Sequence, residues 1–310
     1  MSVRSAAGGL LSRLVVWAFG PGDPRQLAAL RIGLCLTLAL RLATRAQVYL
    51  SLAEQERELF RPRSYMTLVE QMPSRTTIAI CLVAGILAAV LGAAGLLSRT
   101  MLAIALLAAL LLDGMQTSQG KILHNDVLLV LCLTAIVFAR HGDAWSLDAW
   151  IIRRRSRSRR RAVTAARVGA SPAYGWPLRT AMLIIALAYA VAGLHKLAGS
   201  HGLGWASSDN MRWLLYVASD AQGHNSAALW IAERPWAAHL AAYGLLATEC
   251  LFFLVLVIAR LRWIFIPAVI ALHLGTWVTL RLDYSAWVLC VIIVFVTWPT
   301  ALARISRRAA

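Results

Sequence analysis

The stretch TTIAICLVAGILAAVLGAAGLL, residues Thr76–Leu97, contains no charged side chain. Ala237–Ala259 is nearly as apolar and has Glu249 as its acidic residue. Each stretch is long enough to cross a hydrocarbon core of about 30 Å as an α-helix. Because lipid offers the backbone no water, such a segment must satisfy its own N–H and C=O groups. These two stretches predict an α-helical integral membrane protein.

The composition of the whole chain favours the same class. Hydrophobic residues make up 60% of it and charged residues 15%, against about 45–50% and about 25% in a soluble domain. The pattern predicts an all-α bundle of about eight transmembrane helices with short tails, forming a single domain over residues 1–310. The expected spans are Leu27–Tyr49, Thr76–Leu97, Thr100–Ser118, Ile122–Ala139, Leu178–Ala198, Ala237–Ala259, Trp263–Leu280 and Tyr284–Ala303.

The net charge of +17 does not indicate a nucleic-acid partner. Most arginines lie in loops beside the expected spans, where positive residues mark the cytoplasmic side. This distribution places both termini in the cytoplasm, together with an amphipathic segment over 1–26 and an Arg-rich loop over 140–177. It places the loop over 199–235 outside. We therefore expect a multi-pass protein of a bacterial plasma membrane, with membrane lipids among its partners.

Polar and ionisable side chains within the spans identify candidate sites, because a charged group at the helix centre costs about 2.5–3.5 kcal/mol on insertion scales. Most of these groups fall in the outer half of the expected bundle. They predict a polar cavity that opens outward. The candidates are Lys196, His273 and Asn125 for catalysis, and Tyr189, His195, Glu249, Trp277 and Asp126 for substrate binding.

Lys196 is one of two lysines in a chain that otherwise uses arginine. Lysine can lose its proton and act as a base, whereas arginine stays protonated. Tyr189 and Gly193 precede Lys196 by seven and three residues and share its side of the helix. The alternative interpretation is that Lys196 only extends to the outer membrane interface.

The other candidates have structural alternatives too. His273 fits an aromatic-lined pocket with Trp277, or a core histidine bonded to a carbonyl group. Glu249 fits a site residue or an ion-pair partner of an arginine, and Asn125 and Asp126 fit a helix cap. Arg31 and Arg41, in the first span, are expected to be ion-pair partners or interfacial anchors.

The sequence lacks the usual signatures of soluble enzymes, among them HExxH, the Walker motif and GxSxG. The neighbours of Lys196 and the stretch His124–Asp126 also lack the i, i+4 spacing of metal ligands on a helix. No metal is therefore predicted.

Five motifs occur in an order that resembles the HTTM family, the transmembrane domain of vitamin K-dependent γ-glutamyl carboxylase and its bacterial relatives. YAVAGLHKL with Trp205 resembles the family's YxxAGxxKL…W segment. The others are LRIG (Leu30–Gly33), LLLD…HND (Leu110–Asp126), GDAWSLDAW (Gly142–Trp150) and ATEC…ALHLG (Ala247–Gly275).

The resemblance implies that Lys196 is the base that deprotonates a reduced quinone, such as menaquinol or vitamin K hydroquinone. It also aligns His124–Asp126 with the family's Asn-Asn-His stretch, so that Asn125 matches and Asp126 stands where the family has histidine. Within these 310 residues we expect no counterpart of the large extracytoplasmic domain that binds substrate in the carboxylases. Three functions remain open: a quinol-dependent membrane enzyme, a non-catalytic scaffold that helps an exported peptide or protein to mature, or a small-molecule or ion transporter.

Overall fold

In the computed structural model, the described residues are 12–119, 124–158, 169–199 and 202–296. They form helices joined by turns and short 3₁₀ segments, and the described part contains no β-strand. An isolated bridge of β type joins Gly22 to Ser171. The all-α class expected from the sequence is confirmed.

Within the described ranges, six helical segments are long and apolar enough to cross a membrane. They are Pro24–Thr44, Arg75–Ala94, Ser98–Thr117, Pro172–Gly199, Pro235–Leu256 and Ala259–Leu280. Two shorter apolar helices, α6 (Val127–Val137) and α15 (Ser285–Phe295), lie within the other two expected spans. A multi-pass membrane protein is therefore supported, while the count of eight crossings stays a prediction.

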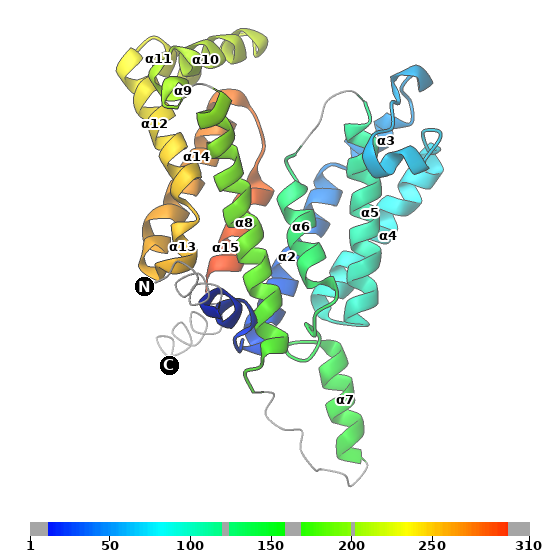
Figure 1. The fold of residues 1–310 in the computed structure, drawn as a ribbon. Coiled ribbons are helices and arrows are strands. Elements are labelled where there is room, and N and C mark those ends of the chain that lie inside the picture. Colours follow the sequence, from blue (N-terminus) through cyan, green and yellow to red (C-terminus); the bar gives the residue numbers. More distant parts are fainter. Residues whose placement is uncertain (1–11, 120–123, 159–168, 200–201, 297–310) are drawn as a thin grey trace, which may run out of the picture. The chain divides into compact units, whose positions relative to one another are not determined.

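The chain divides into two compact units, with the boundary inside α8 (Pro172–Gly199). The first comprises residues 1–181 and 296–310, and the second comprises residues 182–295. The prediction of one domain over 1–310 remains open, and each unit is described by itself (Figure 1).

The first unit is built around α2 (Pro24–Thr44) and α4 (Arg75–Ala94). These two pack together, and α5 (Ser98–Thr117) packs against α4. Glycines allow the close approach: a Cβ on Gly85 would lie 2.7 Å from the Cβ of Ala108, and one on Gly92 would lie 3.3 Å from the Sγ of Cys35. α6 completes this layer against α2 and α5, and α3 (Ala46–Leu52) extends it.

The turn between α4 and α5 is closed by α7 (Leu147–Ser158), which holds part of the GDAWSLDAW motif. Gly95 ends α4 with a left-handed φ of 74°. Asp148 then accepts hydrogen bonds from the backbone N–H groups of Leu97 and Ser98 and from the Ser98 hydroxyl, at 2.8–3.0 Å. The carboxylate thereby caps the first turn of α5, whose N–H groups have no intrahelical partners.

Arg31, on α2, is fully buried, and its guanidinium donates to backbone carbonyls. The acceptors are His141 at 2.5 Å, Trp145 at 2.6 Å and Ala93 at 3.3 Å. We expected Arg31 to be an ion-pair partner or an interfacial anchor. It instead joins α2 to the end of α4 and to the segment that follows α6.

The second unit contains the larger part of α8, the long helices α12 (Pro235–Leu251) and α14 (Arg262–Leu280), the helices α13 (Leu254–Val257) and α15, and three shorter helices between α8 and α12. The shorter ones are α9 (Gly204–Ser207), α10 (Asn210–Ala221) and α11 (Ser226–Ala232). Their shared core consists of Ala206, Met211, Leu215, Ala228, Ala232, Ala238, Ala242 and Leu246. Asn225 caps α11 and also donates to the carbonyls of Val278 and Thr279 at the end of α14.

The helix boundaries differ from the sequence predictions in informative ways. α8 begins at Pro172 and contains Pro177, where we expected the span to begin only after that proline. The described part of the expected loop over 199–235 is mostly helical. Asp209 lies at the N-cap position of α10, and its carboxylate accepts from Arg212 rather than capping the helix.

Candidate functional site

Lys196 and Glu249 form a bidentate pair in the second unit. The Lys196 Nζ lies 2.7 Å from Oε2 and 2.9 Å from Oε1 of Glu249. The Lys196 side chain is 23% exposed and that of Glu249 is 10% exposed. The pair is therefore mostly withdrawn from solvent, and the Lys196 side chain is the more exposed of the two. Glu249 therefore pairs with a lysine, whereas the structural alternative for it was an ion pair with an arginine.

A glycine on α8 brings these two side chains together. A Cβ added to Gly193 would lie 2.6 Å from the Cys250 Sγ, 2.8 Å from the Cys250 backbone nitrogen and 3.1 Å from the Glu249 Cβ. Only a residue without a Cβ allows α12 to approach α8 this closely. Gly193 therefore positions Glu249 opposite Lys196, which lies one helical turn further along α8.

Trp205, on α9, lies next to the ammonium group of Lys196. The Nζ is 5.5 Å from the centroid of the indole ring, within the range of a cation–π contact. The residues that carried the sequence resemblance here, Gly193, Lys196, Trp205 and Glu249, thus form one cluster in space.

Tyr189 and His273 form a second polar contact in the same unit. The Tyr189 hydroxyl lies 2.7 Å from the His273 Nε2, and both side chains are buried. The other ring nitrogen of His273, Nδ1, is buried without a hydrogen-bond partner among the described residues. His273 is therefore bonded to a side chain, and not to a carbonyl group as the structural alternative proposed.

Aromatic rings surround this contact. The Tyr189 ring lies 4.8 Å from Phe252 and 5.6 Å from Trp287, and the His273 ring lies 5.2 Å from Tyr284. Tyr189 and Lys196 are seven residues apart on α8, so they are separated by about 10 Å along the helix axis. The second unit thus places a charged pair and an aromatic cluster two turns apart.

Two of the predicted binding residues do not join these clusters. His195 is exposed on α8. Trp277 is 50% exposed, and the guanidinium of Arg281 lies 5.9 Å from its ring. An exposed tryptophan near the end of a membrane helix is typical of the interfacial aromatic belt.

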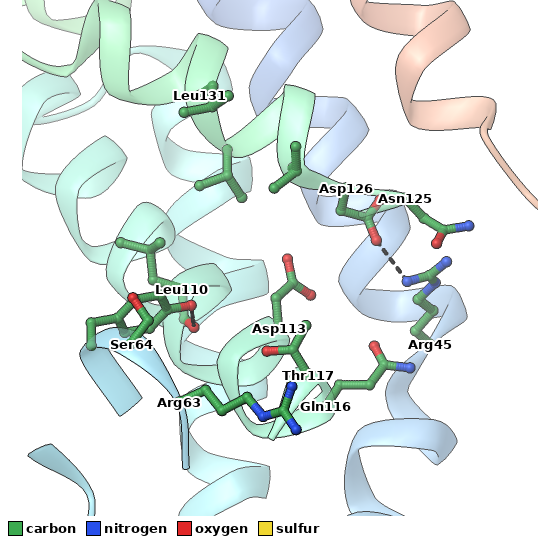
Figure 2. A pocket seen from close by; sticks show the side chains of 13 residues that line it. Arg45, Arg63, Ser64, Leu110, Asp113, Gln116, Thr117, Asn125, Asp126 and Leu131 are labelled. Carbon is green, nitrogen blue, oxygen red and sulfur yellow. Dashed lines mark hydrogen bonds and ion pairs between the residues drawn. The ribbon is translucent and has the colours of Figure 1, made fainter. Parts of the chain in front are cut away.

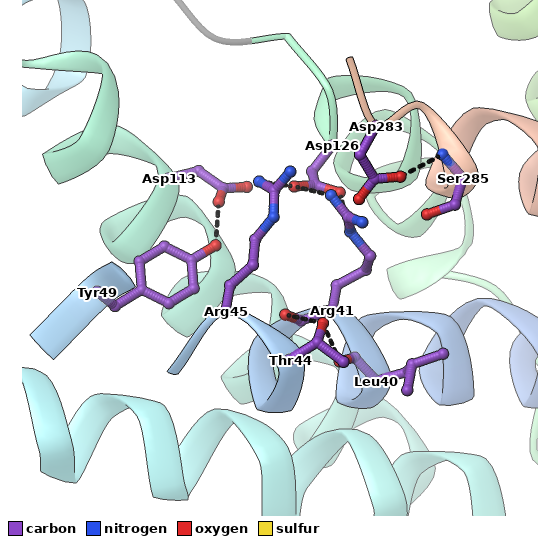
Figure 3. A network of polar contacts seen from close by, with 9 residues as sticks. All are labelled: Leu40, Arg41, Thr44, Arg45, Tyr49, Asp113, Asp126, Asp283 and Ser285. Carbon is purple, nitrogen blue, oxygen red and sulfur yellow. Dashed lines mark hydrogen bonds and ion pairs between the residues drawn. The ribbon is translucent and has the colours of Figure 1, made fainter. Parts of the chain in front are cut away.

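Asn125 and Asp126 belong to the first unit. Asp126 occupies the first position before α6, but its side chain makes no capping bond. Its carboxylate instead accepts from Arg41 at 2.7 and 3.2 Å and from Arg45 at 2.6 Å (Figure 3). The expectation that Arg41 is an ion-pair partner is met by this contact.

A cavity of about 360 Å³ lies beside this network in the first unit (Figure 2). One part of its wall is polar and includes Asn125 and Asp126, and the other part is apolar. Asp113 from α5 also lines it, and its Oδ1 accepts from the Tyr49 hydroxyl at 2.7 Å. The complete lining is Arg45, Arg63, Ser64, Tyr65, Leu110, Asp113, Gln116, Thr117, Asn125, Asp126, Val127, Val130 and Leu131.

Sequence reasoning did not select Arg45, Tyr49 or Arg63 as site residues. The spacing of Arg41, Arg45 and Tyr49 at i, i+4 and i+8 was the available signal, because such residues share one helix face. Arg63 follows in a loop, and no local pattern in the sequence predicts that it lies near this helix face.

No group of three or more His, Cys, Asp or Glu side chains in the described ranges could hold a metal ion. No family model matches the chain, and neither a curated protein nor a solved structure matches it.

Proposed function

We propose that this chain is a membrane protein of the vitamin K carboxylase-like, or HTTM, kind, with a quinol-handling site at Lys196. The observation that carries this proposal is the bidentate contact between Lys196 and Glu249 beside Trp205. It supplies a basic side chain, a carboxylate that can take its proton, and an aromatic surface.

The chemistry follows from the pair. An ammonium group cannot accept a proton, so Lys196 acts as a base only after one proton has moved from Nζ to the Glu249 carboxylate. The neutral amine then accepts the proton of an acidic hydroxyl group, such as that of a reduced quinone. A deprotonated quinol gives up electrons more readily, with molecular oxygen as the acceptor. The flat indole of Trp205 suits a flat quinone ring.

The proposal includes an arrangement in the bilayer. Eight crossings, with both termini and the Arg-rich segment over 140–177 in the cytoplasm, place α9, α10 and α11 outside. This orientation rests on the distribution of arginines. A bacterial plasma membrane, which carries reduced quinones, fits such an arrangement.

A scaffold for the maturation of an exported peptide or protein is the second candidate. Large apolar side chains on the helices over 204–240 support it, because Trp213 is 67% exposed, Val217 is 64% exposed and Trp236 is 61% exposed. Such a surface fits a partner chain or the lipid interface.

Oxygen uptake by the purified protein in nanodiscs with reduced menaquinone tests the first candidate. The wild type is compared with Lys196→Ala and Lys196→Arg, and with Leu194→Ala as a matched control at an exposed neighbouring position. We expect uptake in the wild type and the control, and loss in both lysine variants, since arginine stays protonated.

Uptake that survives Lys196→Arg would remove the base role from Lys196. If no protein shows uptake above empty nanodiscs, the enzyme proposal is overturned and the scaffold becomes the better account.

A further inference from the structure

The cavity of the first unit carries charged groups that the proposed function does not use. Asp126 is occupied by Arg41 and Arg45. Only one carboxylate oxygen of Asp113, on α5, has a hydrogen-bond partner. Tyr49 donates to its Oδ1, and no described residue donates to its Oδ2. The Asp113 carboxylate lines the cavity, so this second oxygen can accept a hydrogen bond from a ligand (Figure 2).

Two arginines supply donors to the same cavity. Arg45 donates its Nη1 to Asp126, and its other guanidinium nitrogens have no hydrogen-bond partner in the described part of the chain. The guanidinium of Arg63, in the segment before the 3₁₀ turn Ser64–Leu68, makes neither a hydrogen bond nor an ion pair with a described residue. The cavity therefore presents free guanidinium donors and one free carboxylate oxygen.

The apolar wall of the cavity continues along the exposed face of α6. Val127 and Leu131 line the cavity and are 44% and 43% exposed, and Phe138, the C-cap residue of α6, is 79% exposed. Residues at i, i+4 and i+11 share one helix face. In a membrane protein, an exposed apolar face of this kind contacts hydrocarbon. A ligand can thus lie with its polar end in the cavity and its apolar part along α6.

We propose that this cavity binds the headgroup of a phospholipid that carries a primary amine, as ethanolamine phospholipids do. The phosphate lies against Arg45 and Arg63, since guanidinium groups bind phosphate oxygens through paired N–H donors. The ammonium group donates to Asp113 Oδ2. The acyl chains lie against Val127, Leu131 and Phe138.

Three other classes of ligand fit the cavity less well than a phospholipid with a primary amine. A choline headgroup has no N–H with which to reach Asp113. A purely anionic headgroup would place negative charge beside the free oxygen of Asp113. A soluble zwitterion would leave the apolar face of α6 unused.

The test measures lipid binding to the full-length protein in detergent by native mass spectrometry. Ethanolamine, choline and glycerol phospholipids with identical acyl chains are titrated separately. We expect the wild type to bind the ethanolamine lipid at least about tenfold more tightly than the choline lipid, as one charge-assisted hydrogen bond predicts. Equal binding of these two lipids, or a preference for the glycerol lipid, overturns the proposal.

Asp113→Asn is the decisive variant, because the amide oxygen of asparagine still accepts from Tyr49 and preserves the fold. It should remove the preference for ethanolamine over choline while leaving choline binding unchanged. Arg63→Ala should weaken both lipids equally. Glu70→Gln, at an exposed acidic residue outside the cavity lining, is the matched control and should keep the wild-type preference. A preference that survives Asp113→Asn contradicts the assignment of the amine.

Competition by soluble glycerophosphoethanolamine distinguishes a site for a membrane lipid from a site for a water-soluble molecule with the same headgroup. We expect this soluble molecule to compete with the lipid only weakly, since it lacks the acyl chains that contact α6. Competition as strong as that of the intact lipid would show a site for a water-soluble molecule and would overturn the lipid assignment.

Discussion

The Nζ of Lys196 lies within 2.9 Å of both carboxylate oxygens of Glu249, across the contact between α8 and α12. Each charged side chain depends on the other, because an unpaired charge withdrawn from water carries a large desolvation cost. Removing either partner alone should therefore destabilise the second unit, whatever the chemical role of the pair. If a substitution at either residue abolishes activity, the stability of that variant must be measured too, because unfolding would also abolish activity.

A double-mutant cycle measures this dependence. Lys196→Met and Glu249→Gln should each lower the free energy of unfolding by about 1.5–3 kcal/mol, the range for hydrogen bonds to charged groups. The double variant should lose less than the sum of the two, because it leaves no charge unpaired. Unfolding in detergent with increasing denaturant provides the measurement. Additive losses would mean that the two side chains do not stabilise each other.

Gly193→Ala tests the close approach of α8 and α12. The new Cβ would lie 2.6 Å from the Cys250 Sγ, and the backbone nitrogen of Cys250 at 2.8 Å cannot yield without moving α12. We expect a loss of about 1–3 kcal/mol in unfolding free energy, as for other overpacked sites. The thermal midpoint in detergent reports this loss.

Gly244→Ala is the matched control, since it also lies on α12 and its Cβ would meet no atom within 4 Å. Alanine favours a helix over glycine by about 0.5–1 kcal/mol, so the control should be neutral or slightly stabilising. Equal behaviour of the two variants would contradict the packing role of Gly193.

The fold class could be predicted from the sequence because it depends on long apolar segments, which composition reveals directly. Each of the six long apolar helices overlaps an expected span, with its ends within about six residues of the ends of that span. Helix ends were less predictable. α8 continues through Pro177, its sixth residue, although a proline at that place removes the hydrogen bond to the Ala173 carbonyl and normally breaks or bends a helix.

The candidate site was predictable only in part. Motif spacing on one helix selected Lys196 and Tyr189, and their partners Glu249 and His273 were chosen as polar groups within spans. The pairing itself depends on tertiary packing through Gly193, which no local pattern encodes. Asn125 and Asp126 were grouped with Lys196 by sequence, whereas the structure places them in the other compact unit.

His141 predicts a pH dependence of stability. It is 1% exposed, and burial together with the neighbouring charges of Arg31 and Arg99 lowers its pKa to about 4. In the unfolded chain the imidazole takes its proton near the ordinary pKa of about 6.5. Between these two values the unfolded state binds more protons, so stability should fall as the pH falls from about 7 to about 4.

Thermal midpoints of the wild type and His141→Gln, measured from pH 8 to pH 5, check this expectation. The variant should show a shallower decline across that range, because its amide does not titrate. Parallel curves for the two proteins would show that His141 does not carry the dependence.

Asp148→Ala removes the cap of α5. Burial by itself raises the pKa of Asp148, but the hydrogen bonds from Ser98 and Leu97 outweigh it and hold the pKa below its ordinary value. The cap should thus be present above that ordinary value and be lost as the pH falls through the lowered one. At neutral pH we expect the variant to lose about 0.5–2 kcal/mol in unfolding free energy. Leu147→Ala, at an exposed neighbour, is the control, and an equal loss there would rule out a capping effect.

The proposed orientation predicts opposite labelling of two exposed positions in a cysteine-free background. Asp220→Cys, on α10, should react in intact cells with a maleimide that cannot cross the membrane. Arg155→Cys, on α7, should react only after the cells are permeabilised, because arginine-rich segments stay in the cytoplasm. Both positions are exposed in the structure, so burial does not limit either reaction. The reverse pattern would invert the orientation. Labelling of both positions in intact cells would place α7 and α10 on the same side of the membrane. The single crossing proposed between them would then be wrong.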